Sequence, residues 1–226
     1  MRQRVVLSIG EQIYRTIREK IIDNKYRPGE MLSIDKLAEA FGVSTTPVRE
    51  VLLRLEGAGL VTILRNRGAA VSPINPDTAH EVWEFRRLLE SYAARFAATR
   101  CDAAKLAEVE RKILVLFGNV GDFDLYKETD RLLHRLLYEN MGNRLIRESL
   151  DTLSDHARRI RYFAESLPFR EEVIDLVSRE HMKIIEALKR RDPAASEAAV
   201  FEHLTHAEER TLDALAKSPV SDAIDE

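Results

Sequence analysis

The chain has 226 residues, of which 45% are hydrophobic and 32% charged, and its formal net charge at pH 7 is −3. Its length allows one large domain or two smaller ones, each able to bury its own core. The N-terminus lacks a signal-peptide pattern, and no apolar run approaches the roughly 20 residues that span a bilayer, so we expect a soluble, cytoplasmic protein with no membrane partner. The single cysteine, Cys101, excludes an internal disulfide.

Residues 8–24 are predicted to form the first helix. Isoleucines recur there at spacings of three and four, a pattern typical of an amphipathic helix with one buried face. Ser8 and Glu11 are placed as a capping box at its start. We expect this helix to support the elements that follow, and Pro28-Gly29 to form the turn into them.

Residues 30–57 are predicted to form a helix-turn-helix. Leu37, Ala38 and Phe41 form the apolar face of a short helix, Gly42-Val43 a tight turn, and Ser44 a cap for the second helix. Pro47 fits in the first turn of that helix, where its backbone nitrogen has no hydrogen bond to make. The predicted buried stripe of the second helix is Val48, Leu52, Leu53 and Leu55, and its exposed face is Ser44, Thr45, Thr46, Arg49 and Arg54.

Residues 60–72 are predicted to form a β-hairpin, the wing of a winged helix. Two apolar strand-like runs, 60–64 and 69–72, flank a basic tip that contains Arg65, Arg67 and Gly68. Residues 1–75 hold 12 Lys+Arg and 8 Asp+Glu, a net charge of +4, so the rest of the chain carries −7. This modest excess means that a phosphate-binding face depends on local clustering of Arg2, Arg4, Arg49, Arg65 and Arg67.

Residues 73–76 contain two prolines and predict a short, stiff connection to a second domain. Beyond it the pattern is helical throughout, and Gly or Pro interrupts it at about 118–122, 140–143, 166–168 and 191–194, with a further break near 101–103. The sequence therefore predicts a mainly α protein, with an antiparallel bundle of six helices after the winged domain. We assign 1–73 to the winged domain, 74–77 to the linker, 78–218 to the bundle and 219–226 to an acidic tail.

Four polar residues occupy positions on the apolar stripes of three bundle helices: Asp130, His134, His181 and His203. Burying them is costly unless something pairs with them, and a divalent cation accepts this set of nitrogen and oxygen ligands. Each residue taken singly is more typical of a hydrogen-bonded core residue, but four together favour a metal site. His206, one turn after His203, is the substitute if the helical register is shifted.

The N-terminal part resembles the DNA-binding domain of the GntR family of bacterial transcription regulators. The resemblance is carried by Pro28, Gly29, Leu32, Leu37, Ala38, Val43, Ser44, Pro47, Val48, Arg49, Glu50, Leu55, Glu56, Gly59, Leu60, Gly68 and Val71. It implies double-stranded DNA contacts from Ser44, Thr45, Thr46, Arg49, Arg65, Arg67 and Gly68. Many relatives carry Arg where this chain has Thr45, so operator sequence should not be copied from a relative.

Residues 78–216 resemble the ligand-binding (FCD) domain of the FadR branch of that family, and six helices suggest its VanR-like subgroup. The matching positions are residues 84–90, Asp130, His134, His181, Ala187, Leu188, Arg191, Asp192, His203 and Leu204. In metal-binding members an Asp and three His at these positions hold a divalent cation, and a small organic acid completes its coordination. The resemblance thus implies a divalent metal, with zinc ahead of nickel or manganese, and a carboxylate effector.

Arg86 corresponds to an arginine of the family's first ligand-domain helix and could bind the effector's carboxylate with its planar fork. The alternative is that Arg86 pairs with Glu90 or Glu81 on its own helix.

The resemblance implies a homodimeric regulator, usually a repressor, that reads a palindromic operator and is not an enzyme. Three other functions stay open: a metal-free regulator, a sensor of the cation itself, and a metalloenzyme using the same His/Asp site.

Overall fold

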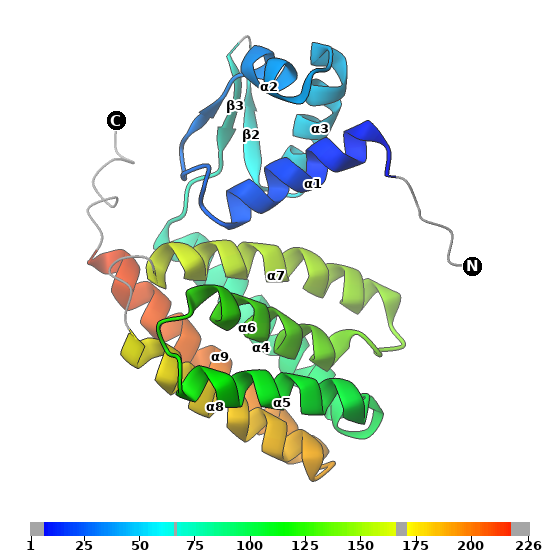
Figure 1. The fold of residues 1–226 in the computed structure, drawn as a ribbon, viewed down its shortest axis with the longest axis vertical. Coiled ribbons are helices and arrows are strands. Elements are labelled where there is room, and N and C mark those ends of the chain that lie inside the picture. Colours follow the sequence, from blue (N-terminus) through cyan, green and yellow to red (C-terminus); the bar gives the residue numbers. More distant parts are fainter. Residues whose placement is uncertain (1–6, 66, 166–170, 218–226) are drawn as a thin grey trace. The chain divides into compact units, whose positions relative to one another are not determined.

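The structure is a computed structural model that describes residues 7–65, 67–165 and 171–217. The chain divides into two compact units: residues up to Asn75 together with Arg158–Phe163, and Pro76–Ala157 together with the residues from Ala164 onward. Helices dominate both units, as the sequence predicts (Figure 1). The predicted N-terminal arginines Arg2 and Arg4 and the predicted tail at 219–226 lie outside the described residues. Within the described residues, no helix is long and apolar enough to cross a membrane.

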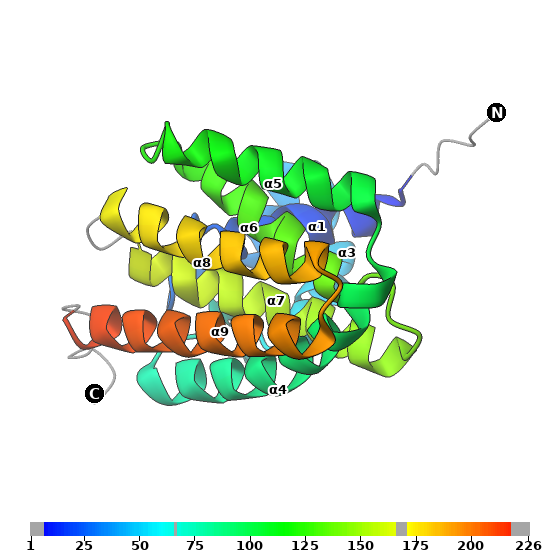
Figure 2. The same ribbon diagram turned by 90° about the horizontal axis from the view of Figure 1, so that it is seen from below.

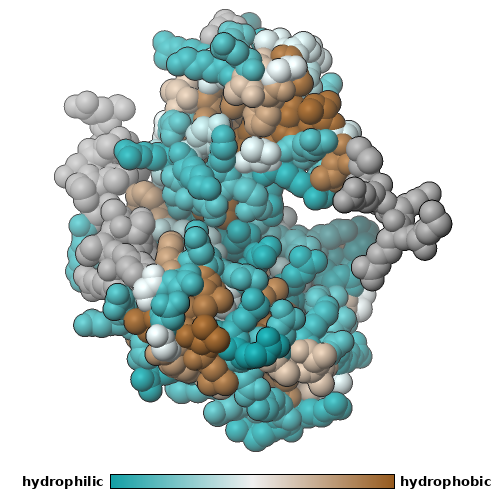
Figure 3. Space-filling view, in the orientation of Figure 1, coloured by the Kyte–Doolittle hydropathy of each residue, from teal (hydrophilic) through white to brown (hydrophobic). Residues whose placement is uncertain are grey.

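The first unit is a winged helix with a three-stranded sheet. Its elements are α1 (Ile9–Ile22), β1 (Met31–Leu32), α2 (Ile34–Phe41), α3 (Thr45–Gly57), β2 (Val61–Leu64) and β3 (Gly68–Val71). The helices pack through the apolar side chains whose periodicity predicted them, and Ile13, Ile17 and Leu55 are fully buried. Figure 3 shows hydrophilic residues over much of the visible surface of this unit, interrupted by an apolar patch.

Helix α1 begins after Ser8, as predicted. The Ser8 hydroxyl accepts a hydrogen bond from the backbone N–H of Glu11 at 3.2 Å. The other half of the expected capping box does not form, because the Glu11 carboxylate binds Arg15 at 2.9 Å and Arg54 of α3 at 3.0 Å. Glu11 therefore ties α1 to α3 and does not close its own helix end.

The buried stripe of α3 corrects one predicted position. Val48, Leu52 and Leu55 are buried, but Leu53 is 58% exposed and Val51 is buried in its place. Positions three, four and seven residues after Val48 share its face of the helix, whereas Leu53, five residues on, is turned away.

The wing pairs β2 with β3, and β1 adds a strand that the sequence did not predict. The strand order is β1-β3-β2, with Met31 opposite Ala70 and Val61 opposite Val71, and both pairings are antiparallel. Gly68 opens β3 with a φ of 101°, and a Cβ atom there would collide with the carbonyl oxygen of Leu32. The wing therefore needs glycine at this position.

The second unit is a bundle whose described part contains the predicted six helices. These are α4 (Pro76–Arg100), α5 (Ala103–Phe117), α6 (Phe123–Tyr138), α7 (Arg144–Glu165), α8 (Glu171–Lys189) and α9 (Pro193–Ala216). Figure 2 shows α4 and α9 side by side. Salt bridges join Arg87 to Glu208 and Arg95 to Glu197, so these two helices run antiparallel.

Helix α4 begins inside the segment predicted as the linker. Pro76 and Asp77 are its first residues, because the fixed φ of proline suits the first turn of a helix and its missing N–H has no intrahelical partner there. Ile74, just before the helix, is 5% exposed. The extended connection between β3 and α4 is therefore shorter than the sequence suggested.

Candidate metal centre and nucleic-acid interface

Three histidines from three helices meet in the interior of the bundle. His134 lies on α6, His181 on α8 and His203 on α9, and each is at most 2% exposed. The ring centroids of His181 and His203 are 4.7 Å apart, and that of His134 lies 5.7 Å from His181 and 5.3 Å from His203. One nitrogen from each ring falls within 4.8 Å of the others. The structure thus gathers three of the four residues that the sequence proposed as ligands.

Asp130, the fourth predicted ligand, lies one turn before His134 and is 2% exposed. Its Oδ1 atom is 3.4 Å from Nε2 of His134 and 3.6 Å from Nε2 of His181. These separations are close to the spacing of about 3.4 Å between ligand atoms around a tetrahedral ion with bonds of roughly 2.1 Å. Asp130 therefore lies beside two of the three histidines, and the group whose ligand atoms all lie within 4.8 Å of one another consists of the histidines.

A buried carboxylate holds the outer nitrogen of His134. Glu90 on α4 is fully buried, and its Oε2 accepts a hydrogen bond from Nδ1 of His134 at 2.6 Å. Its other oxygen accepts a hydrogen bond from Nε of Arg86 at 2.6 Å. Burial alone would raise the pKa of Glu90, but Arg86 and His134 outweigh it and lower this pKa to about 2. Burial would likewise lower the pKa of His134, yet the Glu90 charge raises it above its ordinary value.

A second carboxylate holds His203 in the same way. Oε2 of Glu180 on α8 accepts a hydrogen bond from Nδ1 of His203 at 2.8 Å. Burial lowers the pKa of His203 to about 4 although Glu180 opposes that shift, so this imidazole is neutral at pH 7. Burial would raise the pKa of Glu180, but its bonds to His203 and Arg210 outweigh burial and hold the pKa well below its usual range.

Sequence reasoning missed Glu90 and Glu180 as parts of the site. The sequence pattern indicated Glu90 only as a possible partner of Arg86, and Glu180 adjoins the predicted ligand His181. The available signal was that each acid occupies an apolar stripe of its helix, where a lone carboxylate is costly to bury.

The donor set fits a divalent cation. Because a carboxylate can only accept a hydrogen bond, Nδ1 of His134 and of His203 carries the proton, and Nε2 is the nitrogen free to bind a metal. Both Nε2 atoms are buried, and neither has a hydrogen-bond partner among the described residues. Three imidazole nitrogens and one carboxylate oxygen form a ligand set suited to zinc and to neighbouring transition metals.

Arg86 pairs with Glu90 on its own helix, which is one of the two alternatives that the sequence left open. It is 3% exposed and pairs with Glu90. Its Cζ atom lies 4.8 Å from the centroid of the Trp83 ring. Only its Nε atom is used by Glu90, and the structure shows no hydrogen bond from its two terminal nitrogens to another described residue. Arg86 therefore supports Glu90 and keeps two terminal nitrogens, which carry four N–H donors, for a further partner.

The predicted DNA-contact residues of the helix-turn-helix lie at the start of α3. Ser44 is the N-cap, Thr46 and Arg49 are exposed, and Thr45 is half-buried. The Ser44 hydroxyl does not cap the helix as expected, because the third helical residue is Pro47 and offers no N–H. The hydroxyl of Ser44 is thereby left at the surface of the helix start.

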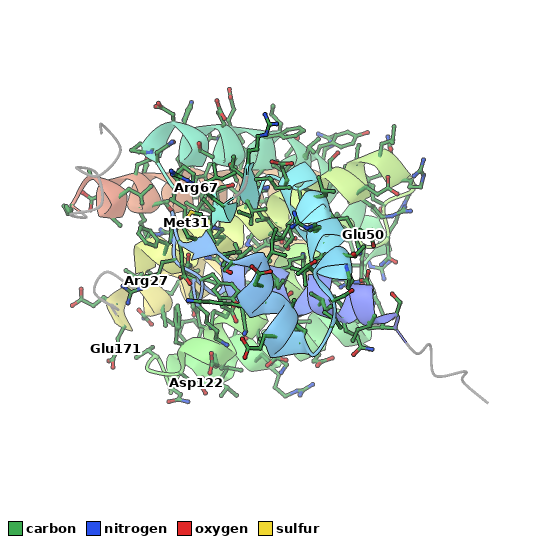
Figure 4. All side chains as sticks on the ribbon, turned by 90° about the horizontal axis from the view of Figure 1, so that it is seen from above. Arg27, Met31, Glu50, Arg67, Asp122 and Glu171 are labelled. Atoms are coloured by element: carbon green, nitrogen blue, oxygen red, sulfur yellow. The ribbon has the colours of Figure 1, made fainter. Side chains whose placement is uncertain are left out.

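The arginines of α3 and of the wing differ in the contacts that they make within the protein. Arg49 makes no hydrogen bond or ion pair with any described residue, whereas Arg54 binds Glu11 and lies 4.0 Å from the Tyr14 ring. In the wing, Arg65 and Arg67 are exposed beside Gly68. Glu50 on α3 and Arg67 in the wing are both labelled in Figure 4. Arg49, Arg65 and Arg67 are thus the arginines of this region whose side chains are available to bind DNA.

Cys101 follows α4 and is half-buried. Burial raises the pKa of its thiol, which keeps the sulfur in its unreactive protonated form at neutral pH.

Comparisons with family models assign both units. Residues 9–71 match the model described as bacterial regulatory proteins, gntR family, and residues 81–206 match the FCD domain. The FCD match alone spans more than half of the chain.

Curated relatives and solved structures agree with these matches. The chain is 29% identical over 201 residues to the HTH-type transcriptional repressor RspR of Escherichia coli, covering 87% of this chain and 86% of that protein. It is 26% identical over 217 residues to the galactonate operon transcriptional repressor of Escherichia coli, covering 87% and 94%. Its fold is similar to that of Escherichia coli McbR/YncC, with a TM-score of 0.78, 21% identity and coverage of 89% and 95%. The two curated relatives are transcriptional repressors.

Proposed function

The chain belongs to the gntR family of bacterial regulatory proteins and carries an FCD domain, and on that premise we propose that it is a metal-dependent repressor controlled by a small organic acid. This proposal rests on one observation: Asp130 and three histidines are buried close together in the interior of the bundle. A transcription regulator has no structural need for so costly a cluster, but a buried cation would give it a partner.

In this proposal Asp130, His134, His181 and His203 hold one divalent cation. When bound, the ion supplies a positive centre that can take carboxylate oxygens as further ligands. Zinc is the first expectation, and nickel or manganese would suit the same donors. The six-helix bundle supports placement in the VanR-like subgroup.

The effector is proposed to be a small carboxylate. The two terminal nitrogens of Arg86 are suited to bind the two oxygens of a carboxylate. Arg86 is also linked to His134, because Glu90 accepts a hydrogen bond from each of them. The galactonate operon repressor, a relative over most of the chain, is named after the operon of an organic acid, which supports this class of effector.

The winged unit is proposed to bind a palindromic operator in the cytoplasm. The start of α3 would contact DNA through Ser44, Thr45, Thr46 and Arg49. The wing would add contacts from Arg65, Arg67 and the backbone of Gly68. A homodimer would place two such units on adjacent half-sites. Hydroxyls and backbone N–H groups fix the protein on phosphates, while an arginine fork can read a guanine.

Control of DNA binding requires that the acid bind one arrangement of the dimer better than another, since equal binding would shift nothing. The proposed site joins α4, α6, α8 and α9, so its occupancy can favour one packing of these helices. A self-satisfied polar core is the competing interpretation, because Asp130 lies within 3.6 Å of two of the imidazoles and could balance their charge alone.

A thermal-shift screen of small carboxylates, run before and after chelation, tests the proposal. A ligand at 100 times its dissociation constant adds about 2.7 kcal/mol to the stability of the folded state, which is easily seen as a raised melting temperature. We expect one acid to stabilise the protein only with metal present, and His181→Ala to abolish the effect. His80→Ala, which alters a histidine outside the cluster, should retain it. Stabilisation that is indifferent to chelation would contradict the metal-dependent mechanism.

A further inference from the structure

Glu180 links α8 to α9 through a set of charge-assisted hydrogen bonds. Its Oε2 accepts from Nδ1 of His203 at 2.8 Å and from Nη2 of Arg210 at 2.9 Å. Its Oε1 accepts from Nη1 of Arg210 at 2.8 Å and from Nδ1 of His206 at 3.0 Å. Four donors from three side chains of α9 therefore fix both carboxylate oxygens, and Glu180 is only 6% exposed.

This arrangement determines which nitrogen of His203 faces the interior. An ionised carboxylate cannot donate, so the proton of the neutral ring stays on Nδ1 and the lone pair is on Nε2. The planar fork of Arg210 restricts rotation of the carboxylate, which in turn restricts the imidazole ring. Glu180 thus sets both the tautomer and the orientation of His203.

His134 is held by an equivalent set of contacts from a different helix. Glu90 accepts from Nδ1 of His134 at 2.6 Å and is itself held by Nε of Arg86 at 2.6 Å. Both sets have the order arginine, carboxylate, imidazole. In both, the imidazole keeps a buried Nε2 that has no hydrogen-bond partner among the described residues.

We propose that Glu180 and Glu90 are positioning residues of the metal centre: by holding Nδ1–H of His203 and His134, they present the Nε2 lone pairs to the cation and set its affinity. This inference rests on the proposed metal-dependent function. Carboxylates that bind the outer nitrogen of a ligand histidine raise its basicity and fix its orientation, and their loss lowers metal affinity without removing a ligand.

Glu180 is the better residue to test. Replacing Glu90 would leave Arg86, which is 3% exposed, without its anionic partner in the core. The side chain of Arg210 is 22% exposed, so water can solvate it when Glu180 is changed. In Glu180→Gln the amide can donate to Nδ1 of His203, which moves the proton to Nε2 and blocks metal binding there.

The experiment measures the affinity of the full chain for Zn²⁺ and Co²⁺ by competition with a chromophoric chelator. We expect Glu180→Gln to bind roughly 10- to 100-fold more weakly than the wild type and to alter the visible spectrum of bound Co²⁺. Glu186→Gln, an exposed acid on the same helix, is the matched control and should bind like the wild type. Arg210→Lys keeps the ligands, Glu180 and the charge but loses the fork, so we expect a smaller loss of affinity.

The tautomer of His203 gives a readout that needs no metal. Nitrogen-15 NMR of the metal-free protein at neutral pH should show the proton on Nδ1 in the wild type and a larger Nε2–H fraction in Glu180→Gln. If Glu180→Gln does not fold, Arg210→Lys supplies both measurements.

The outcomes separate the two proposals. Failure of the wild type to bind either ion contradicts the metal-dependent function. Wild-type binding with unchanged affinity in Glu180→Gln, or in Arg210→Lys if only that variant folds, overturns the positioning role alone.

Discussion

Replacing Arg49 with alanine should weaken operator binding while leaving the fold intact. Arg49 is exposed on the second turn of α3 and has no ion pair or hydrogen bond with a described residue, so its loss removes no contact seen within the protein. If its fork reads a guanine, the lost contact is worth about 1–3 kcal/mol, which corresponds to a roughly 5- to 150-fold rise in Kd. If it contacts a phosphate instead, the log–log salt slope should fall by about 0.9.

Arg54→Ala is the matched control on the same helix. Arg54 is occupied by Glu11 and the Tyr14 ring, so it is not available to DNA in the way that Arg49 is. Fluorescence anisotropy with a duplex selected from a random pool, titrated at several salt concentrations, distinguishes the two variants. Equal affinities and salt slopes for wild type and Arg49→Ala would refute the assigned role, as would a larger loss from Arg54→Ala.

Three further predictions concern stability. Gly68→Ala should lower the free energy of unfolding by about 1–3 kcal/mol or more in a urea titration, because φ is positive there and a Cβ would meet the Leu32 carbonyl; an unchanged value would contradict the wing geometry. Leu52→Ala should cost about 2–5 kcal/mol while Leu53→Ala changes little, and equal effects would show that the buried face of α3 is misassigned. Glu90→Gln should be less stable than the metal-free wild type above pH 4.5, because the folded-state pKa of Glu90 is lowered to about 2. Its ionised form then favours folding by roughly 3 kcal/mol, an advantage lost as pH falls toward 2, so a stability gap that persisted at acid pH would disprove the assignment.

Hydrophobic periodicity predicted the helices well because each buries one face. The isoleucines of α1 and the glycines and prolines between the bundle helices located the elements to within a few residues. Strand β1 was missed because it has only two residues and is defined by its pairing with β3, which no local pattern reveals. The sequence predicted that Leu53 is buried, whereas Val51 is. This error arises because residues 51–53 are all apolar, so hydrophobicity alone does not show which of them faces the core.

The candidate metal residues were predictable because polar side chains on an apolar stripe are costly. Their outer partners were not, because Glu90 lies 44 residues from His134 and Glu180 lies 23 residues from His203 in the sequence. Such contacts depend on how the helices pack, and the sequence offered only local alternatives for Arg86. The failed cap at Ser44 has a local cause, the missing N–H of Pro47, which the sequence already contained.

Metal analysis of the protein tests the proposal that Asp130 and the three histidines hold a metal ion. After incubation with zinc and removal of free ions, mass spectrometry should find one ion per chain in the wild type. His203→Ala should lose it, and His80→Ala should keep it. A wild-type protein that retains no zinc, nickel or manganese would contradict the account, and the four residues would then form a self-satisfied polar core.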